Sequence, residues 1–258
     1  MGAAMPDRIA VRPVADLMTA LGTERFPVVL ASVLRTIAPF SYIVVFGYSG
    51  AARPMALFDD VPPNKWRIFV GDYQSGPYLL DPFYLACTQP VTAGLYRVKD
   101  LAPDRFYQGE YFRSYYIQTG LTEEIGYFVD LPGGVMVVLS LMRTERSFSS
   151  REFRDLQVAF PVVEAAIRRH WADLPQRFSI GLHESAVPGP RKDPGRAFAT
   201  FGQTVLTPRE REVVEYMLKG HSAEATGVIV NIAPGTVRIH RSNIYAKLGI
   251  SSQGELFG

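Results

Sequence analysis

The stretch LTPREREVVEYMLKGHSAEATGVIVNIAPGTVRIHRSNIYAKLGISSQGEL, residues 206–256, decides how the C-terminal part of the chain folds. It opens with Thr207, Pro208 and Glu210. This is the pattern of a capping box, in which a hydroxyl and a carboxylate bind free backbone N–H groups at the start of a helix. Apolar residues then recur on one helical face, and Gly220 is suited to end the helix in the left-handed conformation. A helix beginning at Pro208 is therefore predicted.

Two more helices are predicted directly after it. Ser222 is suited to cap a short second helix, and a turn through Asn231 leads to Pro234, a favourable first residue for a third helix that ends at Gly249. The third helix has an apolar inward face with Val237, Ile244 and Leu248, and an outer face with Arg238, Ile239, Ser242 and Tyr245. Two helices joined by a tight turn, the second with an exposed basic face, form a helix-turn-helix. A fourth helix is predicted from Ser252.

This stretch resembles the C-terminal DNA-binding domain of LuxR-type transcriptional regulators. The residues that carry the resemblance are Leu206, Thr207, Arg209, Glu210, Glu212, Gly220, Thr236, Val237, His240, Asn243, Ile244, Tyr245, Lys247, Leu248 and Gly249. Two sites depart from the family pattern: Thr226-Gly227 replaces an Ile-Ala pair, and Ala233 replaces the Ser or Thr before the third helix. Glycine within a helix costs about 1 kcal/mol relative to alanine, and a lost cap costs a similar amount. A weakened module is therefore expected.

The resemblance implies that the third helix enters the major groove of DNA. We expect DNA contacts from Thr236, Arg238, Ile239, Arg241, Ser242 and Lys247. Of these, Arg238, Ile239 and Ser242 match base-contacting residues of similar regulators, and the other three are expected near phosphates. The net charge of +2 says little about nucleic acid, but residues 225–254 contain three Lys or Arg residues and no Asp or Glu.

The N-terminal part of the 258-residue chain, about 200 residues, is long enough for a second domain with its own core. Strands are predicted at 41–49, 54–58, 125–131 and 135–142, and amphipathic helices at 14–21, 26–37 and 149–171. Because the strands alternate with helices without a βαβ repeat, we expect an antiparallel sheet between layers of helices. This arrangement resembles the α/β/α sensor domain of LuxR-type proteins, which is related in shape to GAF and PAS domains.

The predicted fold class is therefore an α+β N-terminal domain followed by a small all-α helix-turn-helix domain. We place the ligand-sensing domain at residues 1–174, a linker at 175–203 and the DNA-binding domain at 204–258. The linker is predicted because the segment contains several prolines and a basic PGPRKDPGR run but no hydrophobic periodicity.

Aromatic residues crowd into the chain between Trp66 and Tyr116. Each of them taken singly is suited to core packing or to the surface. Together, around one carboxylate, they indicate a small-molecule site. The residues expected to contact the ligand are Tyr42, Tyr48, Trp66, Tyr73, Tyr78, Asp81 and Tyr111. Such a site would suit a compact ligand with an apolar body and one amine or amide donor.

Asp81 has two interpretations. With Pro82 it matches the Asp-Pro pair of acyl-homoserine-lactone receptors, and the resemblance implies that it accepts a hydrogen bond from a ligand amide. Similar residues of that pattern also fall at Pro90-Val91, Gly120, Gly133-Gly134 and Ser140. However, Ala93 stands where the pattern has tryptophan, and Trp66 has a different spacing from Asp81, so the domain type is implied but the lactone ligand is not. The second interpretation is that Asp81 caps a helix beginning at Pro82.

No pattern typical of catalysis or metal binding occurs. The four histidines are scattered, and Cys87 alone forms neither a disulfide framework nor a cysteine-rich metal site. Phosphate-binding loops and nucleophile elbows are missing from the sequence. We therefore expect no enzyme, no catalytic residue, no cofactor and no metal. Since neither a signal peptide nor a membrane-spanning apolar run is evident, a cytoplasmic protein is expected.

These patterns predict a transcriptional regulator in which a small molecule bound to the N-terminal domain tunes binding to double-stranded operator DNA. The alternative is an N-terminal domain that serves protein interaction or dimerisation without a small-molecule ligand. A homodimer is expected, because the helix at 149–171 carries a second apolar edge with Val158, Val162 and Ala165. Both edges could instead be buried within one subunit. Pro161 is expected to kink this helix.

Overall fold

The computed structural model describes residues 11–109, 111–184 and 202–251. Its centre is a five-stranded sheet built from β1 (Tyr42–Ser49), β2 (Met55–Asp59), β3 (Gly94–Arg97), β4 (Glu123–Leu131) and β5 (Val135–Arg143). The strand order is β2-β1-β5-β4-β3, and every neighbouring pair is antiparallel. The predicted antiparallel sheet is confirmed, and β3 is an edge strand that the sequence patterns did not indicate.

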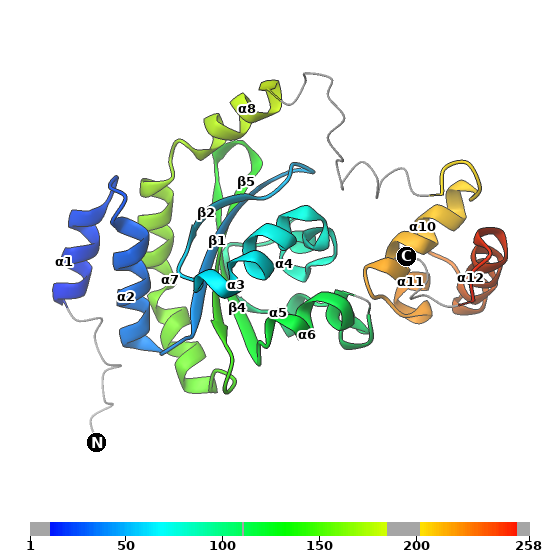
Figure 1. The fold of residues 1–258 in the computed structure, drawn as a ribbon, viewed down its shortest axis with the longest axis horizontal. Helices are drawn as coiled ribbons and strands as arrows, with labels where there is room; N and C mark the ends of the chain where they lie inside the picture. The colour runs from blue at the N-terminus through cyan, green and yellow to red at the C-terminus, as the bar shows by residue number, and fades with distance from the viewer. Residues whose placement is uncertain (1–10, 110, 185–201, 252–258) are drawn as a thin grey trace.

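One face of the sheet is covered by long helices (Figure 1). They are α2 (Phe26–Ile37), α7 (Ser150–His170) and α8 (Leu174–Glu184), and α1 (Val11–Ala20) packs on the outer side of α2. The predicted capping box of α7 is present, since the Ser149 side chain accepts from the Glu152 backbone and the Glu152 carboxylate accepts from Ser149 N. Pro161 lies inside α7 as expected. This layer presents mainly aliphatic side chains to the sheet.

Helix α8 differs from the prediction of a linker beginning at residue 175. Leu174 is fully buried and Phe178 is 5% exposed, and both belong to the apolar core on this face of the sheet. Four residues apart, they lie on the same side of a helix, and this single apolar pair was too short to show as a periodicity. The packed N-terminal structure therefore continues beyond residue 174. The basic run of the predicted linker lies outside the described residues.

The other face of the sheet is covered by short helical segments. They are α3 (Pro63–Trp66), η1 (Arg67–Asp72), η2 (Tyr73–Ser75), η3 (Pro77–Leu80), α4 (Pro82–Cys87), α5 (Val98–Leu101), η4 (Phe106–Gln108), η5 (Tyr111–Tyr116) and α6 (Ile117–Thr119). A 3-10 turn, η6 (Pro132–Gly134), connects β4 to β5. The residues between Trp66 and Tyr116 form much of this layer, so most of the aromatic segment predicted to bind a ligand packs against the sheet.

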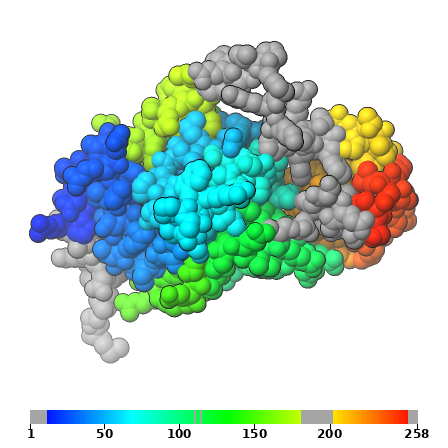
Figure 2. All heavy atoms as spheres, in the orientation of Figure 1, coloured from blue at the N-terminus to red at the C-terminus, as the bar shows by residue number. Residues whose placement is uncertain are grey.

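The described residues of the C-terminal part, 202–251, form three helices. This part lies at one end of the molecule (Figure 2). The three helices are α10 (Pro208–Leu218), α11 (Ala223–Ile229) and α12 (Pro234–Leu248). The predicted capping box of α10 is present at Thr207 and Glu210, Ser222 caps α11, and Gly249 ends α12 at φ 68°. The fourth helix predicted from Ser252 lies outside the described residues.

Gly227 has a packing reason that the sequence did not reveal. A side chain at this position would place its Cβ 2.7 Å from the carbonyl oxygen of Ile232. The Ile232 backbone N–H in turn donates to the Gly227 carbonyl at 2.9 Å. The turn between α11 and α12 therefore approaches α11 too closely for any side chain, and glycine here fits the module instead of weakening it. Ala233, by contrast, makes no side-chain capping bond to α12.

Candidate functional site

The recognition helix α12 is anchored by its apolar side and leaves its polar side open. Val237 is 2% exposed and Ile244 is fully buried, as predicted for the inward face. Thr236, Arg238 and Ser242 are exposed, and Ile239 is 62% exposed. An apolar side chain left this open on a helix-turn-helix is available for contact with a partner surface.

The cations of α12 are in different environments. The Arg238 guanidinium forms an ion pair with Glu224 on α11, with both side chains more than half exposed. Arg241 is half-buried and has no ion-pair partner among the described residues. Lys247 donates through Nζ to Glu210 Oε2 at 2.7 Å, so its ammonium links α12 to α10. This bond and the Thr207 cap lower the pKa of Glu210 to about 2.

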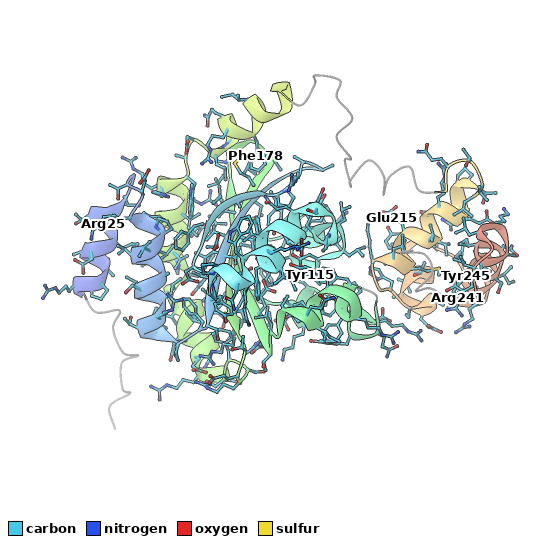
Figure 3. All side chains as sticks on the ribbon, viewed as in Figure 1. Arg25, Tyr115, Phe178, Glu215, Arg241 and Tyr245 are labelled. Atoms are coloured by element: carbon cyan, nitrogen blue, oxygen red, sulfur yellow. The ribbon has the colours of Figure 1, made fainter. Side chains whose placement is uncertain are left out.

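A second cluster of polar groups lies on the short-helix side of the sheet. We name it the tyrosine cluster; it contains Tyr48, Tyr73, Tyr78, Tyr84, Tyr111, Tyr115 and Tyr116, with the carboxyl groups of Asp81 and Glu124. Figure 3 shows Tyr115 in this layer. Neighbouring rings contact edge to face or at tilted angles, for example Tyr78 and Tyr84 at 5.0 Å.

The structure confirms that Asp81 caps a helix, and it shows a second hydrogen bond to the same carboxylate. Its Oδ1 accepts from the Phe83 backbone N–H at 3.0 Å, which caps α4, and its Oδ2 accepts from the Tyr73 hydroxyl at 2.6 Å. The Tyr48 hydroxyl lies 2.9 Å from that of Tyr73. Because Tyr73 donates its hydrogen to the carboxylate, Tyr48 donates to Tyr73, and the two tyrosines form a short relay that ends at Asp81.

The electrostatics of the cluster follow from burial. Burial raises the pKa of Asp81 to about 6, against the hydrogen bonds from Tyr73 and Phe83, which lower it. Burial also raises the pKa of Tyr48, Tyr73 and Tyr111, with the Asp81 charge adding to the rise. The hydroxyls therefore remain protonated and can donate hydrogen bonds.

Glu124, at the start of β4, is the site residue that the sequence analysis missed. Burial raises its pKa to about 8, with the charge of Asp81 adding to the rise and a hydrogen bond with Ser140 opposing it. At neutral pH the two carboxyls together carry roughly one negative charge. Its sequence signal was weak, because Glu123-Glu124 resembles the polar start of an exposed strand. Only the strand register, which places Gly126 opposite Ser140, shows that Glu124 faces inward.

Two predicted ligand residues lie apart from the others. The Trp66 side chain is 46% exposed, and its Nε1 donates to Asp59 Oδ2 at 3.2 Å. Tyr42 is half-buried near the edge, where its ring contacts Phe69 and lies under the Lys65 ammonium. The structure brings together the other five predicted residues, Tyr48, Tyr73, Tyr78, Asp81 and Tyr111.

Within residues 11–109, 111–184 and 202–251, no group of three His, Cys, Asp or Glu side chains could hold a metal ion. In the same ranges no helix is both long enough and apolar enough to cross a membrane. The Cys87 thiol has a pKa well above its ordinary value, because burial and the charge of Asp81 both disfavour the thiolate. It is therefore unreactive as a nucleophile.

A helix-turn-helix joined to an α/β/α domain with a buried polar cluster defines a DNA-binding regulator. Residues 204–257 match the family described as GerE, bacterial regulatory proteins of the luxR family. An HTH-type transcriptional regulator in the exeN 3' region of Aeromonas salmonicida is 31% identical over 179 residues, covering 69% of this chain and 91% of that protein. The monoamine regulon transcriptional regulator of Klebsiella aerogenes is 23% identical over 240 residues, 92% of each chain.

The N-terminal domain has a solved counterpart. The crystal structure of the VqsR LBD domain from Pseudomonas aeruginosa superposes with a TM-score of 0.56 at 25% identity, covering 63% of this chain and 96% of that one. The chain belongs to the LuxR family of bacterial regulatory proteins, and it is a DNA-binding transcriptional regulator. The members of the family that it resembles are regulators and not enzymes.

Proposed function

We propose that this regulator senses a compact molecule carrying a cationic amine, which binds at the tyrosine cluster and changes the affinity of the helix-turn-helix for operator DNA. The observation that carries the proposal is a pair of carboxyls in the core of this layer, the buried Asp81 and the half-buried Glu124. Neither carboxyl has an ion-pair partner in the described part of the chain. A buried charge without a counter-ion is unfavourable, and a ligand ammonium group would supply one.

The surroundings of the pair also favour an amine. Tyrosine rings attract a cation through their faces, by roughly 0.5–2 kcal/mol depending on desolvation. The protonated hydroxyl of Tyr111 can donate to a further polar group of the ligand. Two similar proteins support this proposal. The relative from Klebsiella aerogenes regulates a monoamine regulon, which supports an amine, and the solved counterpart is a ligand-binding domain, which supports a small-molecule site.

The ligand test is a binding screen on the full chain. Compact primary amines would be compared with alcohols of the same shape by thermal shift, in which a true ligand stabilises the protein in proportion to its occupancy. The amines should stabilise the wild type, and Asp81→Asn should weaken that response by about tenfold, or 1.4 kcal/mol. Asn can still cap α4, so the loss would report the charge. Equal responses to amines and alcohols would contradict an amine sensor.

One observation favours the alternative, in which the N-terminal domain has no small-molecule ligand. Tyr48, Tyr73 and Asp81 already satisfy one another, and so do Glu124 and Ser140. A closed polar network of this kind can simply specify the core. If no compound in the screen stabilises the full chain while operator binding remains intact, the protein-interaction alternative holds.

For DNA we propose that α12 enters the major groove, with Arg238, Ile239 and Ser242 facing bases and with Thr236 and Arg241 near phosphates. Lys247 is already bound to Glu210, so we propose that its charge acts only at longer range. Arg238→Ala should relax selectivity at one base pair and weaken operator affinity by about 1–3 kcal/mol, measured by fluorescence anisotropy. Unchanged affinity and selectivity would refute this placement. Binding to operator DNA places the site of action in the cytoplasm.

We also propose that the protein acts as a homodimer through α7. Val158 is 64% exposed and Ala165 is exposed, while Leu156, Val163 and Ile167 bury the opposite side of the helix. An apolar edge left open in one subunit suits an isologous contact with a second copy. Val158→Asp should shift the sedimentation coefficient to that of a monomer at micromolar protein. A wild-type monomer with and without DNA would exclude the dimer.

A further inference from the structure

The two domains contact each other at a defined place. The backbone N–H of Arg105 donates to the Gly220 carbonyl at 3.1 Å, and the Ser222 N–H donates to Asp104 Oδ1 at 3.0 Å. Gly220 has a φ of 91° and approaches the chain around Phe106 closely. The apolar core on the tyrosine-cluster side of the sheet also continues without a break into the helix-turn-helix. The segment around η4, which includes Asp104 and Arg105, therefore packs directly against the turn between α10 and α11.

A pocket of about 290 Å³ lies beside this contact. The residues that line it include Arg105, Gln108 and Arg113 of the N-terminal domain and Thr226, Arg238 and Arg241 of the helix-turn-helix. Four arginines, two from each domain, thus line one small space. Among the described residues that line the pocket, none is an Asp or a Glu. Since arginine is always charged in proteins, the pocket is strongly electropositive.

The nearby acids neutralise only part of this charge. Glu224 pairs with Arg238, and Asp104 is bound to the Ser222 backbone. Arg105, Arg113 and Arg241 have no ion-pair partner among the residues that the structure describes. Like charges facing each other across a domain contact oppose that contact unless a counter-ion lies between them.

A further unsatisfied group lies in the same wall. Thr226 is fully buried, and its hydroxyl has no hydrogen-bond partner among the described residues. A buried hydroxyl without a partner costs stability, and its place beside four arginines is consistent with a polar occupant of the pocket.

We propose that this pocket binds a small anion bearing a phosphate group, held by arginines from both domains. A guanidinium group binds two phosphate oxygens through paired hydrogen bonds. Four arginines carry more positive charge than one carboxylate can neutralise, so a phosphate group, with its higher negative charge, suits the pocket better. Thr226 and Val237, which also line the pocket, are themselves buried.

The bound anion has a consequence for DNA. It engages Arg238 and Arg241 on the recognition helix and ties them to Arg105 and Arg113 on the N-terminal domain. The same two α12 arginines cannot contact the anion and DNA at once. Phosphate therefore competes with DNA, and it does so more strongly than the screening by an equal ionic strength of chloride.

The test titrates inorganic phosphate into the full chain by calorimetry, against potassium chloride at matched ionic strength. Wild type should show saturable phosphate binding that Arg113→Ala weakens by about tenfold or more. Arg25→Ala, an exposed arginine at the opposite end of the molecule (Figure 3), should leave the binding unchanged. Arg113 is exposed, so its replacement should not disturb folding, which circular dichroism checks. Arg105→Ala provides a second, independent loss of one charge on the same side.

The second experiment measures how tightly the protein binds a DNA duplex of arbitrary sequence. Fluorescence anisotropy compares this affinity in phosphate and in chloride at matched ionic strength. Displacement of the duplex by phosphate in wild type, but much less in Arg113→Ala, supports the proposal. It is overturned if phosphate binding is not saturable, or if wild type and both arginine variants bind phosphate equally. It is also overturned if Arg113→Ala weakens duplex binding while phosphate does not bind, because the pocket then takes a backbone phosphate of DNA.

Discussion

The two faces of the central sheet carry different kinds of side chain, aliphatic on one face and largely aromatic and polar on the other. On the side of α2 and α7, β1 and β5 present Ile43, Val45, Val137 and Leu139, all fully buried among other aliphatic side chains. On the side of the short helices, the same strands contribute Phe46, Tyr48 and Ser140 to a layer that contains seven tyrosines and two carboxyls. A single sheet thus separates an aliphatic core from a polar one.

The difference indicates how the domain divides stability from function. Aliphatic burial stabilises without directional demands, whereas buried carboxyls lower stability unless they have partners. Gly126 is required by the close packing on the short-helix side of the sheet. A side chain there would place its Cβ 2.8 Å from the ring of Phe83, the residue whose N–H Asp81 caps. The aliphatic face should therefore control unfolding, and the tyrosine face should control the response to a ligand and to pH.

The largest effect is expected on the aliphatic face. Leu139→Ala removes a fully buried side chain and should lower the free energy of unfolding by about 2–5 kcal/mol, through lost burial and the cavity left behind. Urea titration measures this loss, and Ile117→Ala, at a side chain 56% exposed, serves as the control. If both variants lost equal stability, the aliphatic face would not be the stabilising one.

The next prediction concerns pH. The folded-state pKa values of Asp81 and Glu124 are raised to about 6 and about 8. The folded chain therefore holds more protons than the unfolded chain between about pH 4 and 8, and its free energy of unfolding falls as pH rises through that window. The lowered pKa of Glu210 acts only below about pH 4.5, where stability rises with pH.

Glu124→Gln removes the larger of these two contributions. It should flatten the decline above pH 6 and stabilise the protein at pH 9, by at most about 5 kcal/mol, since the pKa is raised from 4.5 to about 8 and each unit corresponds to about 1.4 kcal/mol. Chemical unfolding across this pH range measures the slope. Glu145→Gln changes an exposed carboxyl and should leave it intact. A variant with the wild-type slope would show that Glu124 is not the titrating group.

A smaller effect separates the two hydrogen bonds of Asp81. In the absence of ligand, Asp81→Ala loses the cap on α4 and should destabilise by about 1 kcal/mol more than Asp81→Asn, which can still accept from Phe83 N. Thermal unfolding of the two variants gives the difference directly. Equal melting temperatures would mean that the cap contributes nothing and that Asp81 acts through its charge alone.

The smallest effect is expected in the helix-turn-helix, where a buried polar group can again be compared with an apolar one. Thr226→Val keeps the shape of a fully buried side chain and removes a hydroxyl that has no partner among the described residues. It should stabilise the chain by about 1 kcal/mol in chloride buffer, since an unsatisfied buried group is relieved. A melting temperature below that of wild type would show that the hydroxyl is satisfied after all.

The helix-turn-helix could be predicted from sequence almost completely, because its information is local. Capping residues, helix-ending glycines and the spacing of Val237 and Ile244 act over a few residues, and each was found where expected. The two departures from the family pattern had different outcomes. Ala233 lacks a cap as predicted, whereas the need for Gly227 depends on a backbone contact across a turn, which no local pattern encodes.

The N-terminal site could be predicted only in part. Five of the seven expected ligand residues meet on one face of the sheet, because aromatic and acidic residues near one another in sequence were carried there by successive short helices. Glu124 comes from a strand far along the chain, and its inward direction depends on register. Trp66 lies apart from these five residues, and its indole donates to Asp59 at the surface.

The pairing of β1 with β5 has a consequence for the order in which the domain forms. Ser49 lies opposite Val135, so the two central strands close a loop of roughly 85 residues. During synthesis, β1 therefore leaves the ribosome long before its main partner exists, and the segments with the other six tyrosines of the cluster emerge in between. Such non-local pairing is slow and leaves apolar strands exposed while they wait. The sensor domain should thus be most vulnerable to aggregation and proteolysis before Arg143 has been made, and not after release.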